Sequence, residues 1–329
     1  MIVCLIIAVL LGWSLGKNNM GNLFGTAVGT RMIRLKIAGI LALTFVFIGA
    51  FCSGGATTES VLKISPLQTP RDIIVVMLSA VFVLELLSRL GIPASIVQTI
   101  LGALIGWNLF SQTQTDWTLV QKMIFAWFWA PALAAVFSFL LMHFTRRILH
   151  KYSLSIFTRD IALRIGLIVM GSLSAYTLGA NNTGIITGPY LNAFRQISLP
   201  VMTLIACGSI ALGCLMADKK VIATVGRRLF PLTPAEAMVV MFGTVISMAC
   251  FSMTSLRTAL EALNLPTFPL VPIPVSSVMI GAICGIALTK GGRGLNISVL
   301  GRIVLSWILV PVVAGALCWG LLCYEMGIN

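Results

Sequence analysis

Residues 16–30 read GKNNMGNLFGTAVGT and residues 179–189 read GANNTGIITGP, so a Gly-rich stretch with two adjacent asparagines occurs twice. Both stretches interrupt apolar segments of the chain. Glycine lets a backbone bend and approach a ligand closely, and an Asn amide offers hydrogen-bond donors and an acceptor. The recurrence indicates an internal duplication that brings a polar stretch into apolar surroundings in each copy.

The composition is typical of a membrane protein. The chain has 329 residues, of which 58% are hydrophobic and 9% charged, and its mean hydropathy is +1.03. A soluble domain carries about 25% charged residues, so soluble, disordered, coiled-coil and disulfide-scaffold classes are excluded. The length accommodates about ten spans of roughly 20 residues. We therefore expect an all-α polytopic protein of the cell membrane.

Apolar stretches predict ten spans, five before about residue 150 and five after it: 1–16, 37–58, 73–88, 90–115, 123–145, 165–194, 196–217, 237–256, 262–289 and 303–324. If the loop at 146–164 lies inside the cell, 16 of the 22 Lys and Arg residues lie inside and 5 outside, with Lys17 set apart. This asymmetry is the one that orients membrane proteins. The net charge of +13 therefore indicates topology rather than nucleic-acid binding.

Three further short matches support the duplication. They are IPAS at 92–95 with IPVS at 273–276, GALIG at 102–106 with GAICG at 281–285, and Trp127-x3-Pro131 with Trp307-x3-Pro311. Five spans per copy is an odd number, so the second copy enters the membrane inverted. We predict two inverted-topology repeats of five spans, residues 1–150 and 151–329, with broken or re-entrant helices at the centre.

In such a fold the substrate binds between the repeats, where broken helices expose backbone groups. The span at 1–16 is short, so we expect it to end inside the protein, in the first polar stretch. Candidate binding residues in the first pair of stretches are Lys17, Asn18, Asn19, Asn22, Thr26, Asn181, Asn182 and Thr183. The alternative is close helix packing by small residues, with Asn as an interhelical hydrogen-bonding group.

A second pair of segments, Pro93–Gly106 and Pro272–Gly285, combines proline, hydroxyl residues and a Gly-Ala-x-x-Gly helix. A helix that begins in this way points free N–H groups and a positive dipole end at a ligand, which favours an anion. The register of the second copy is ambiguous by two residues. Candidate anion donors are Ser95, Gln98, Thr99, Ser276 and Ser277. A re-entrant or kinked packing element is the alternative.

Intramembrane charges are few. Glu85 lies four residues before Arg89, a spacing typical of a local ion pair, with a role in coupling as the alternative. Lys17 either extends to the inner surface or pairs with an anion. The chain has no HExxH, GxSxG or P-loop motif and no metal-ligand spacing of Cys or His. We therefore expect neither an enzyme nor a metal site.

Residues 16–29 resemble the G-A-N-D-x-A-N-A-x-G-T-x-V-G signature of the inorganic phosphate transporter (PiT) family, which includes sulfate permeases. Residues 179–189 resemble the second copy of that signature, and Pro93–Gly106 resembles the family's P-V-S-T-T-H element. KKVIATVG at 219–226, LTP at 232–234 and SWILVP at 306–311 extend the similarity over nearly the whole chain. The resemblance implies a carrier of a small inorganic oxyanion, most readily phosphate.

The departures from that signature concern charge. The family's Asp is Asn19 in the first copy and Asn182 in the second, its Ala is Lys17, and its second Asn is Ile185 in the second copy. The resemblance assigns those carboxylates to the coupling cation. Loss of the two carboxylates together with the added Lys17 makes the site about three charge units more positive, and burial of an anion needs such compensation. We therefore expect no cofactor and a reduced need for coupling Na⁺ or H⁺.

The expected function is transport of inorganic phosphate by alternating access. Sulfate is the alternative substrate, because a site without carboxylates has no acceptor for a phosphate O–H, and an anion channel is a further alternative. The expected partners are the anion and the lipid bilayer, with no nucleic acid. A homodimer is an assembly that the sequence leaves open.

Overall fold

The computed structural model describes residues 2–329 except 56–57, 59–60, 62–63, 65–66, 68, 152–154, 195–196, 326 and 328–329. The five cations expected on the outer side of the membrane are Lys63, Arg71, Lys122, Arg195 and Arg257. Two of them, Lys63 and Arg195, are not among the described residues. The described chain forms helices and no strand: α1 (Ile2–Gly29), α2 (Leu35–Ser53), α4 (Pro70–Arg89), α5 (Ile96–Ser111), α6 (Trp117–Lys151), α7 (Ile156–Ala193), α8 (Leu199–Leu215), α9 (Lys219–Ala223), the π-helical η1 (Thr224–Arg228), α10 (Pro234–Ser252), α11 (Thr254–Ala262), α12 (Val275–Leu288) and α13 (Ile297–Glu325).

Six of these helices are long and apolar enough to cross a membrane: α1, α2, α6, α7, α10 and α13. A seventh candidate is the pair formed by α8 and α9–η1, which bends by 65°. The apolar helices α5 and α12 have 16 and 14 residues. They reach about 24 and 21 Å, less than the ~30 Å of a hydrocarbon core. The chain is an all-helical multi-pass membrane protein, and the number of ten crossings stays a prediction.

The expectation that the first span ends near residue 16 is wrong. Helix α1 continues through residues 16–29 of the first polar stretch, and α7 continues through residues 179–189. A Cβ on Gly16 would collide with the carbonyl oxygen of Ile210, and one on Gly179 with that of Val46. These glycines therefore serve close backbone packing, as small residues do between membrane helices, which outweighs their low helix propensity.

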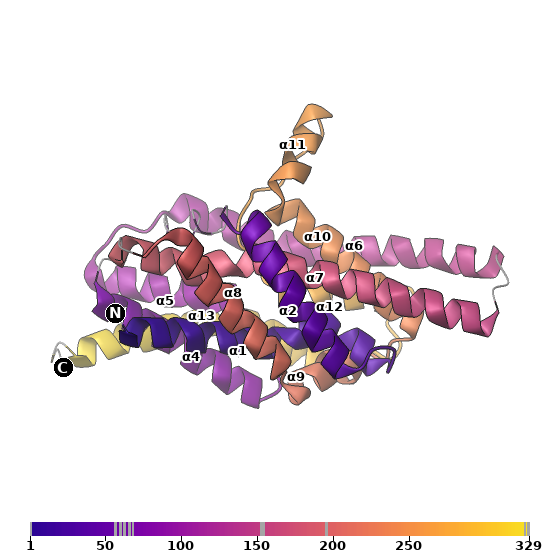
Figure 1. Ribbon diagram of the computed structural model, residues 1–329, viewed down its shortest axis with the longest axis horizontal. Coiled ribbons are helices and arrows are strands. Elements are labelled where there is room, and N and C mark those ends of the chain that lie inside the picture. The colour runs from indigo at the N-terminus through magenta and orange to yellow at the C-terminus, as the bar shows by residue number, and fades with distance from the viewer. Residues whose placement is uncertain are drawn as a thin grey trace.

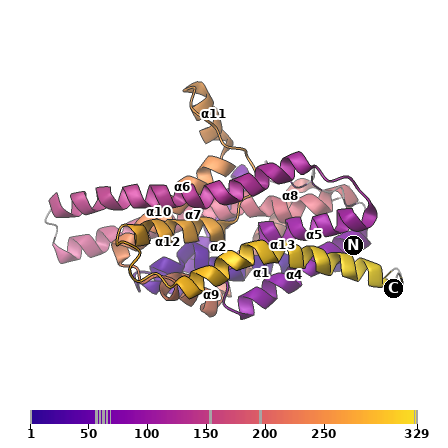
Figure 2. The ribbon, with the colours of Figure 1, turned by 180° about the vertical axis from the view of Figure 1, so that it is seen from behind.

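Helices from the two halves of the chain pack on one another. Helix α1 crosses α8 and α7 crosses α2, while α5 crosses α13 and α12 crosses α6 (Figure 1, Figure 2). Gly102 of α5 lies against the Pro311 backbone of α13, and Gly281 of α12 lies against the Pro131 backbone of α6. Each contact in one half thus has a counterpart in the other. Each of these four interfaces therefore joins one helix from residues 1–150 to one helix from residues 151–329.

The cation-rich loops gather at one end of the helical bundle. Arg227 Nε donates to the carbonyl of Gly29 (3.0 Å), and an Arg146 nitrogen donates to Thr289 Oγ1 (3.1 Å). The start of α1 and the end of α13 both lie at the other end, away from the α6–α7 hairpin (Figure 1). This arrangement agrees with the separation of charges between alternate loops in the sequence.

Candidate functional site

The first asparagine of each pair holds a backbone segment that leads into a short helix. Asn18 Oδ1 accepts a hydrogen bond from Ala94 N (3.0 Å), and its Nδ2 donates to Ile92 O (3.4 Å). Asn181 bonds both backbone groups of Ile273, with Nδ2 to O at 2.9 Å and N to Oδ1 at 3.2 Å. Both side chains are fully buried. Asn18 and Asn181 therefore each hold the segment before a short helix through one donated and one accepted backbone hydrogen bond.

The second asparagine of each pair bonds along its own helix. Asn19 Nδ2 donates to Leu15 O (3.1 Å), and Asn182 Nδ2 donates to Leu178 O (3.2 Å). In the first copy the series continues, because Asn22 Nδ2 donates to Asn19 Oδ1 (2.9 Å). The two asparagines of each pair thus differ in role, although they are adjacent in sequence.

Several buried polar atoms of predicted site residues have no hydrogen-bond partner among the described residues. They are Asn22 Oδ1, Thr26 Oγ1, Thr183 Oγ1, Ser276 Oγ and Ser277 Oγ. Each of these residues is at most 2% exposed. Buried polar groups in native proteins nearly always have a partner. These atoms are therefore available to a polar ligand.

The starts of α5 and α12 settle the register that the sequence leaves ambiguous. Helix α5 begins at Ile96 and α12 at Val275, so Gln98 and Ser277 both occupy the third helical position. The segment between the isoleucine that the asparagine bonds and the start of the short helix is therefore two residues shorter in the second copy (Ile273 to α12) than in the first (Ile92 to α5). Ser276 and Ser277 lie in the first turn of α12, where the positive end of the helix dipole favours an anion.

Ser95 and Thr99 have local partners. Ser95 Oγ accepts from Gln98 N (3.3 Å) as the N-cap of α5, and Thr99 Oγ1 donates to Ser95 O (2.7 Å). A capping hydroxyl of this kind satisfies one of the free N–H groups at a helix start. These two residues therefore stabilise α5, whereas the Gln98 side chain has no hydrogen bond in the described structure and is 3% exposed.

Helices α1 and α7 run antiparallel past one another. Tyr190 Oη donates to Cys4 O (3.0 Å) at one end, and the Phe24 ring lies against Gly171 at the other. The midpoint between these contacts falls within about five residues of each asparagine pair, or roughly 7 Å of helix axis. The two asparagine pairs therefore lie near the middle of the crossing.

The short helices also pack on these two long helices, α12 against α1 and α5 against α7. Val97 at the start of α5, Ile185 of α7 and Pro272 before α12 line one small cavity. The structure thus brings the two Pro-containing segments together next to the second polar stretch. This convergence required the tertiary fold, since the segments are about 180 residues apart in sequence.

Lys17 forms an ion pair with Glu85. Its Nζ lies 2.7 and 2.8 Å from the two carboxylate oxygens, and Ser14 Oγ donates to Oε1 (2.9 Å). Lys17 Nζ also lies 4.5 Å from the centroid of the Trp13 ring. In the described structure Glu85 therefore pairs across helices, and the expected local pair with Arg89 is not formed. The ammonium charge is neutralised beside the polar stretch.

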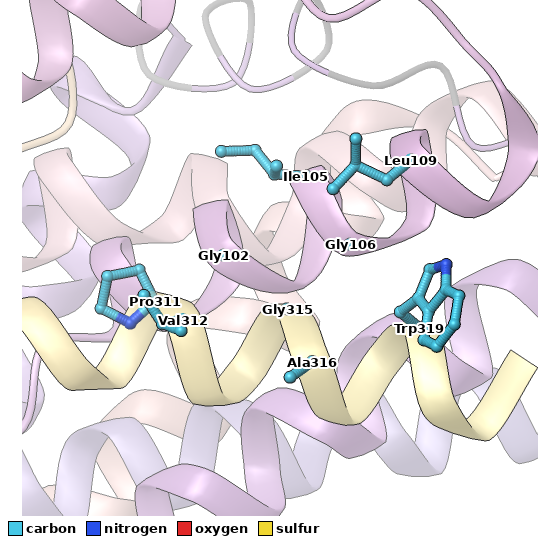
Figure 3. A pocket seen from close by; sticks show the side chains of 9 residues that line it. All are labelled: Gly102, Ile105, Gly106, Leu109, Pro311, Val312, Gly315, Ala316 and Trp319. Atoms are coloured by element: carbon cyan, nitrogen blue, oxygen red, sulfur yellow. The ribbon is translucent and has the colours of Figure 1, made fainter.

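The α5–α13 crossing carries a groove of about 460 Å³ that is lined by apolar residues (Figure 3). Its lining is Gly102, Ile105, Gly106, Leu109, Pro311, Val312, Gly315, Ala316 and Trp319. It contains none of the predicted site residues and offers no polar side chain apart from the Trp319 indole. The groove therefore lacks the donors that an oxyanion needs.

Comparisons with known proteins agree with this arrangement. The model of the phosphate transporter family matches residues 15–159 and 153–318. A Haemophilus influenzae protein named as a phosphate permease is 25% identical, with 93% of this chain and 91% of that protein aligned. One from Methanocaldococcus jannaschii is 24% identical over 94% and 93%. A solved structure described as the sodium-dependent phosphate transporter has the same fold, with a TM-score of 0.76, 20% identity and coverage of 97% and 98%.

Proposed function

This chain belongs to the phosphate transporter family, whose members are permeases rather than enzymes, and on that premise we propose that it carries inorganic phosphate across the membrane. The observation that supports this function is the set of buried, unpartnered polar atoms beside two short helices. Hydroxyls of Thr26, Ser276 and Ser277 can donate to oxyanion oxygens, and the start of α12 adds a positive dipole end.

The proposed mechanism is alternating access by two inverted repeats, residues 1–150 and 151–329. Three observations support it: α1 and α7 run antiparallel, Asn18 and Asn181 hold equivalent segments, and the helix crossings occur in equivalent pairs. Rocking of one repeat against the other around a central site is how inverted-repeat carriers work. The proposal includes ten membrane crossings, counted with the half-length and bent helices.

We also propose that sodium coupling is weak or absent. Asn19 and Asn182 provide neutral oxygens where the family signature has carboxylates. Because Glu85 neutralises Lys17, the protein balances the anion mainly with hydrogen-bond donors and helix ends. The two asparagines also weaken binding of the coupling cation, because neutral amide oxygens attract Na⁺ less strongly than carboxylates do.

The test is uptake of labelled phosphate and labelled sulfate into proteoliposomes at a fixed membrane potential, with and without a sodium gradient. Saturable phosphate uptake with counterflow supports a phosphate carrier, and uptake that ignores sodium supports weak coupling. Steep sodium dependence would remove the coupling proposal only. Sulfate uptake without phosphate uptake would make the protein a sulfate permease, and large non-saturating currents would make it a channel.

A further inference from the structure

Building on the proposed function, we propose that Asn22 Oδ1 accepts a hydrogen bond from an O–H group of bound phosphate. This single acceptor then selects protonated oxyanions over sulfate. The sequence alone favours sulfate as the alternative because it shows no carboxylate acceptor in the polar stretches. The structure presents a neutral acceptor there instead.

The orientation of Asn22 follows from a series of three groups on α1. The backbone oxygen of Leu15 can only accept, so Asn19 must point its Nδ2 toward that oxygen (3.1 Å). Asn19 Oδ1 then faces Asn22 and accepts from its Nδ2 (2.9 Å). A flip of either amide would place two acceptors or two donors against each other. The group that Asn22 leaves unpartnered is therefore its oxygen.

The surroundings of this oxygen match a protonated oxyanion. Asn22 is fully buried, and Oδ1 has no donor among the described residues. Thr26 follows one turn later on the same face of α1, and its hydroxyl is also buried and unpartnered. Helix α12 packs on α1 and carries two further unpartnered hydroxyls, those of Ser276 and Ser277, in its first turn. Hydroxyls can donate to the oxygens of the anion, whereas Asn22 Oδ1 can only accept.

Phosphate and sulfate differ in the group that such an acceptor recognises. Near neutral pH every form of inorganic phosphate carries at least one O–H, and sulfate carries none. Bound sulfate would place an oxygen lone pair against Asn22 Oδ1 and leave this buried acceptor unpaired. One unpaired buried group corresponds to about a tenfold to hundredfold loss in affinity.

The acceptor belongs to the first repeat. The equivalent position of the second repeat is Ile185, which lines an apolar cavity with Val97 and Pro272. An anion held between the repeats would therefore present one O–H toward α1 and its remaining oxygens to hydroxyl and backbone donors. Monohydrogen phosphate has the single O–H that this arrangement requires.

The experiment compares four tetrahedral anions as competitors of labelled phosphate uptake in proteoliposomes. Phosphate and arsenate carry O–H groups near neutral pH, whereas sulfate and selenate do not. Each of these two pairs contains a smaller and a larger anion, so the effect of anion size can be separated from the effect of the O–H group. We expect arsenate to compete well and both sulfate and selenate to compete about 100-fold less well. In Asn22→Leu the preference for arsenate over selenate should fall at least about tenfold.

Asn182→Leu is the matched control, since it removes a similarly buried amide that bonds within its own helix, to the carbonyl of Leu178. It should lower uptake of all anions alike and keep the preference. If Asn22→Leu does not elute as a folded protein, Asn22→Asp preserves an acceptor and should keep the preference for O–H anions while weakening phosphate uptake.

The outcomes separate this inference from the function on which it rests. Absence of saturable phosphate uptake by the unmodified protein overturns the proposed function. Phosphate uptake that selenate inhibits as well as arsenate overturns the role of Asn22 alone. The same holds if Asn22→Leu lowers uptake but leaves the arsenate preference unchanged, because Asn22 would then be a structural residue.

Discussion

The substitution Glu85→Gln tests whether the Lys17–Glu85 pair stabilises the contact between α1 and α4. It keeps the shape of the side chain and removes its charge. The two side chains are only 15% and 24% exposed, and the nitrogen lies within 2.8 Å of both carboxylate oxygens. Removal of one partner of a buried ion pair costs about 3–5 kcal/mol. We expect about 2–3 kcal/mol here, because the pair keeps some contact with solvent.

Removal of both charges is expected to restore the stability that removal of one charge costs. Counted from the starts of the two polar stretches and of α4 and α10, Ala180 and Ala249 stand in the second half where Lys17 and Glu85 stand in the first, so neither of these positions carries a charge there. The single variants Lys17→Met and Glu85→Leu should each lose stability. The double variant Lys17→Met/Glu85→Leu should recover most of that loss, because well-packed apolar groups replace buried ion pairs at little cost. The coupling energy of the double-mutant cycle should then be at least about 1 kcal/mol.

Thermal unfolding of the purified protein in detergent measures these differences. Glu261→Gln is the control: Glu261 lies 2.7 Å from Arg257, but these side chains are 50% and 43% exposed. The control should change stability by less than about 1 kcal/mol. The reasoning fails if Glu85→Gln is as stable as the unmodified protein, or if the two single effects simply add in the double variant.

The remaining predictions concern packing and coupling. Asn181→Ala should cost about 2–4 kcal/mol in unfolding free energy, because it leaves the buried backbone N–H and C=O of Ile273 without partners. A variant with unchanged unfolding temperature would contradict the role of Asn181 in holding the segment before α12. Gly179→Ala should reduce folded yield in gel filtration, since its Cβ meets the α2 backbone, whereas Gly301→Ala on the exposed face of α13 meets nothing within 4 Å and should fold normally; equal yields would refute the packing role. Asn19→Asp should weaken phosphate uptake in the absence of sodium and make uptake depend on sodium, as followed by labelled uptake; unchanged sodium-free affinity would remove Asn19 from the site.

Most of the candidate site could be predicted from the sequence, but the roles of its residues could not. The repeated asparagine pairs identify the polar region, and the structure buries all four side chains near the α1–α7 crossing. Adjacent asparagines on a helix point about 100° apart. Asn18 therefore faces the segment before α5, while Asn19 bonds within α1. A repeated sequence motif shows that both residues matter to the fold without showing which neighbour each one faces.

The sequence also suggested helix breaks in the wrong place. Glycines at 16, 21, 25 and 29 are typical of a bend, yet α1 is continuous through them. Gly16 and Gly29 lie against backbone atoms of Ile210 and Gly226. Close approach of two helices and a bend need the same residue type, so composition alone does not separate them. The breaks before α5 and α12 were predicted correctly, because proline acts locally on its own backbone.

By itself, the sequence determined the class of protein, the recurrence of short motifs along the chain and the set of polar residues within apolar segments. Hydropathy and repeats are local or periodic properties, so they can be read along the chain. Only the tertiary structure decided that Lys17 pairs with Glu85, 68 residues away, and that Asn18 bonds the backbone N–H of Ala94, 76 residues away. Such partners depend on which helix faces meet, and that is set by packing between distant segments.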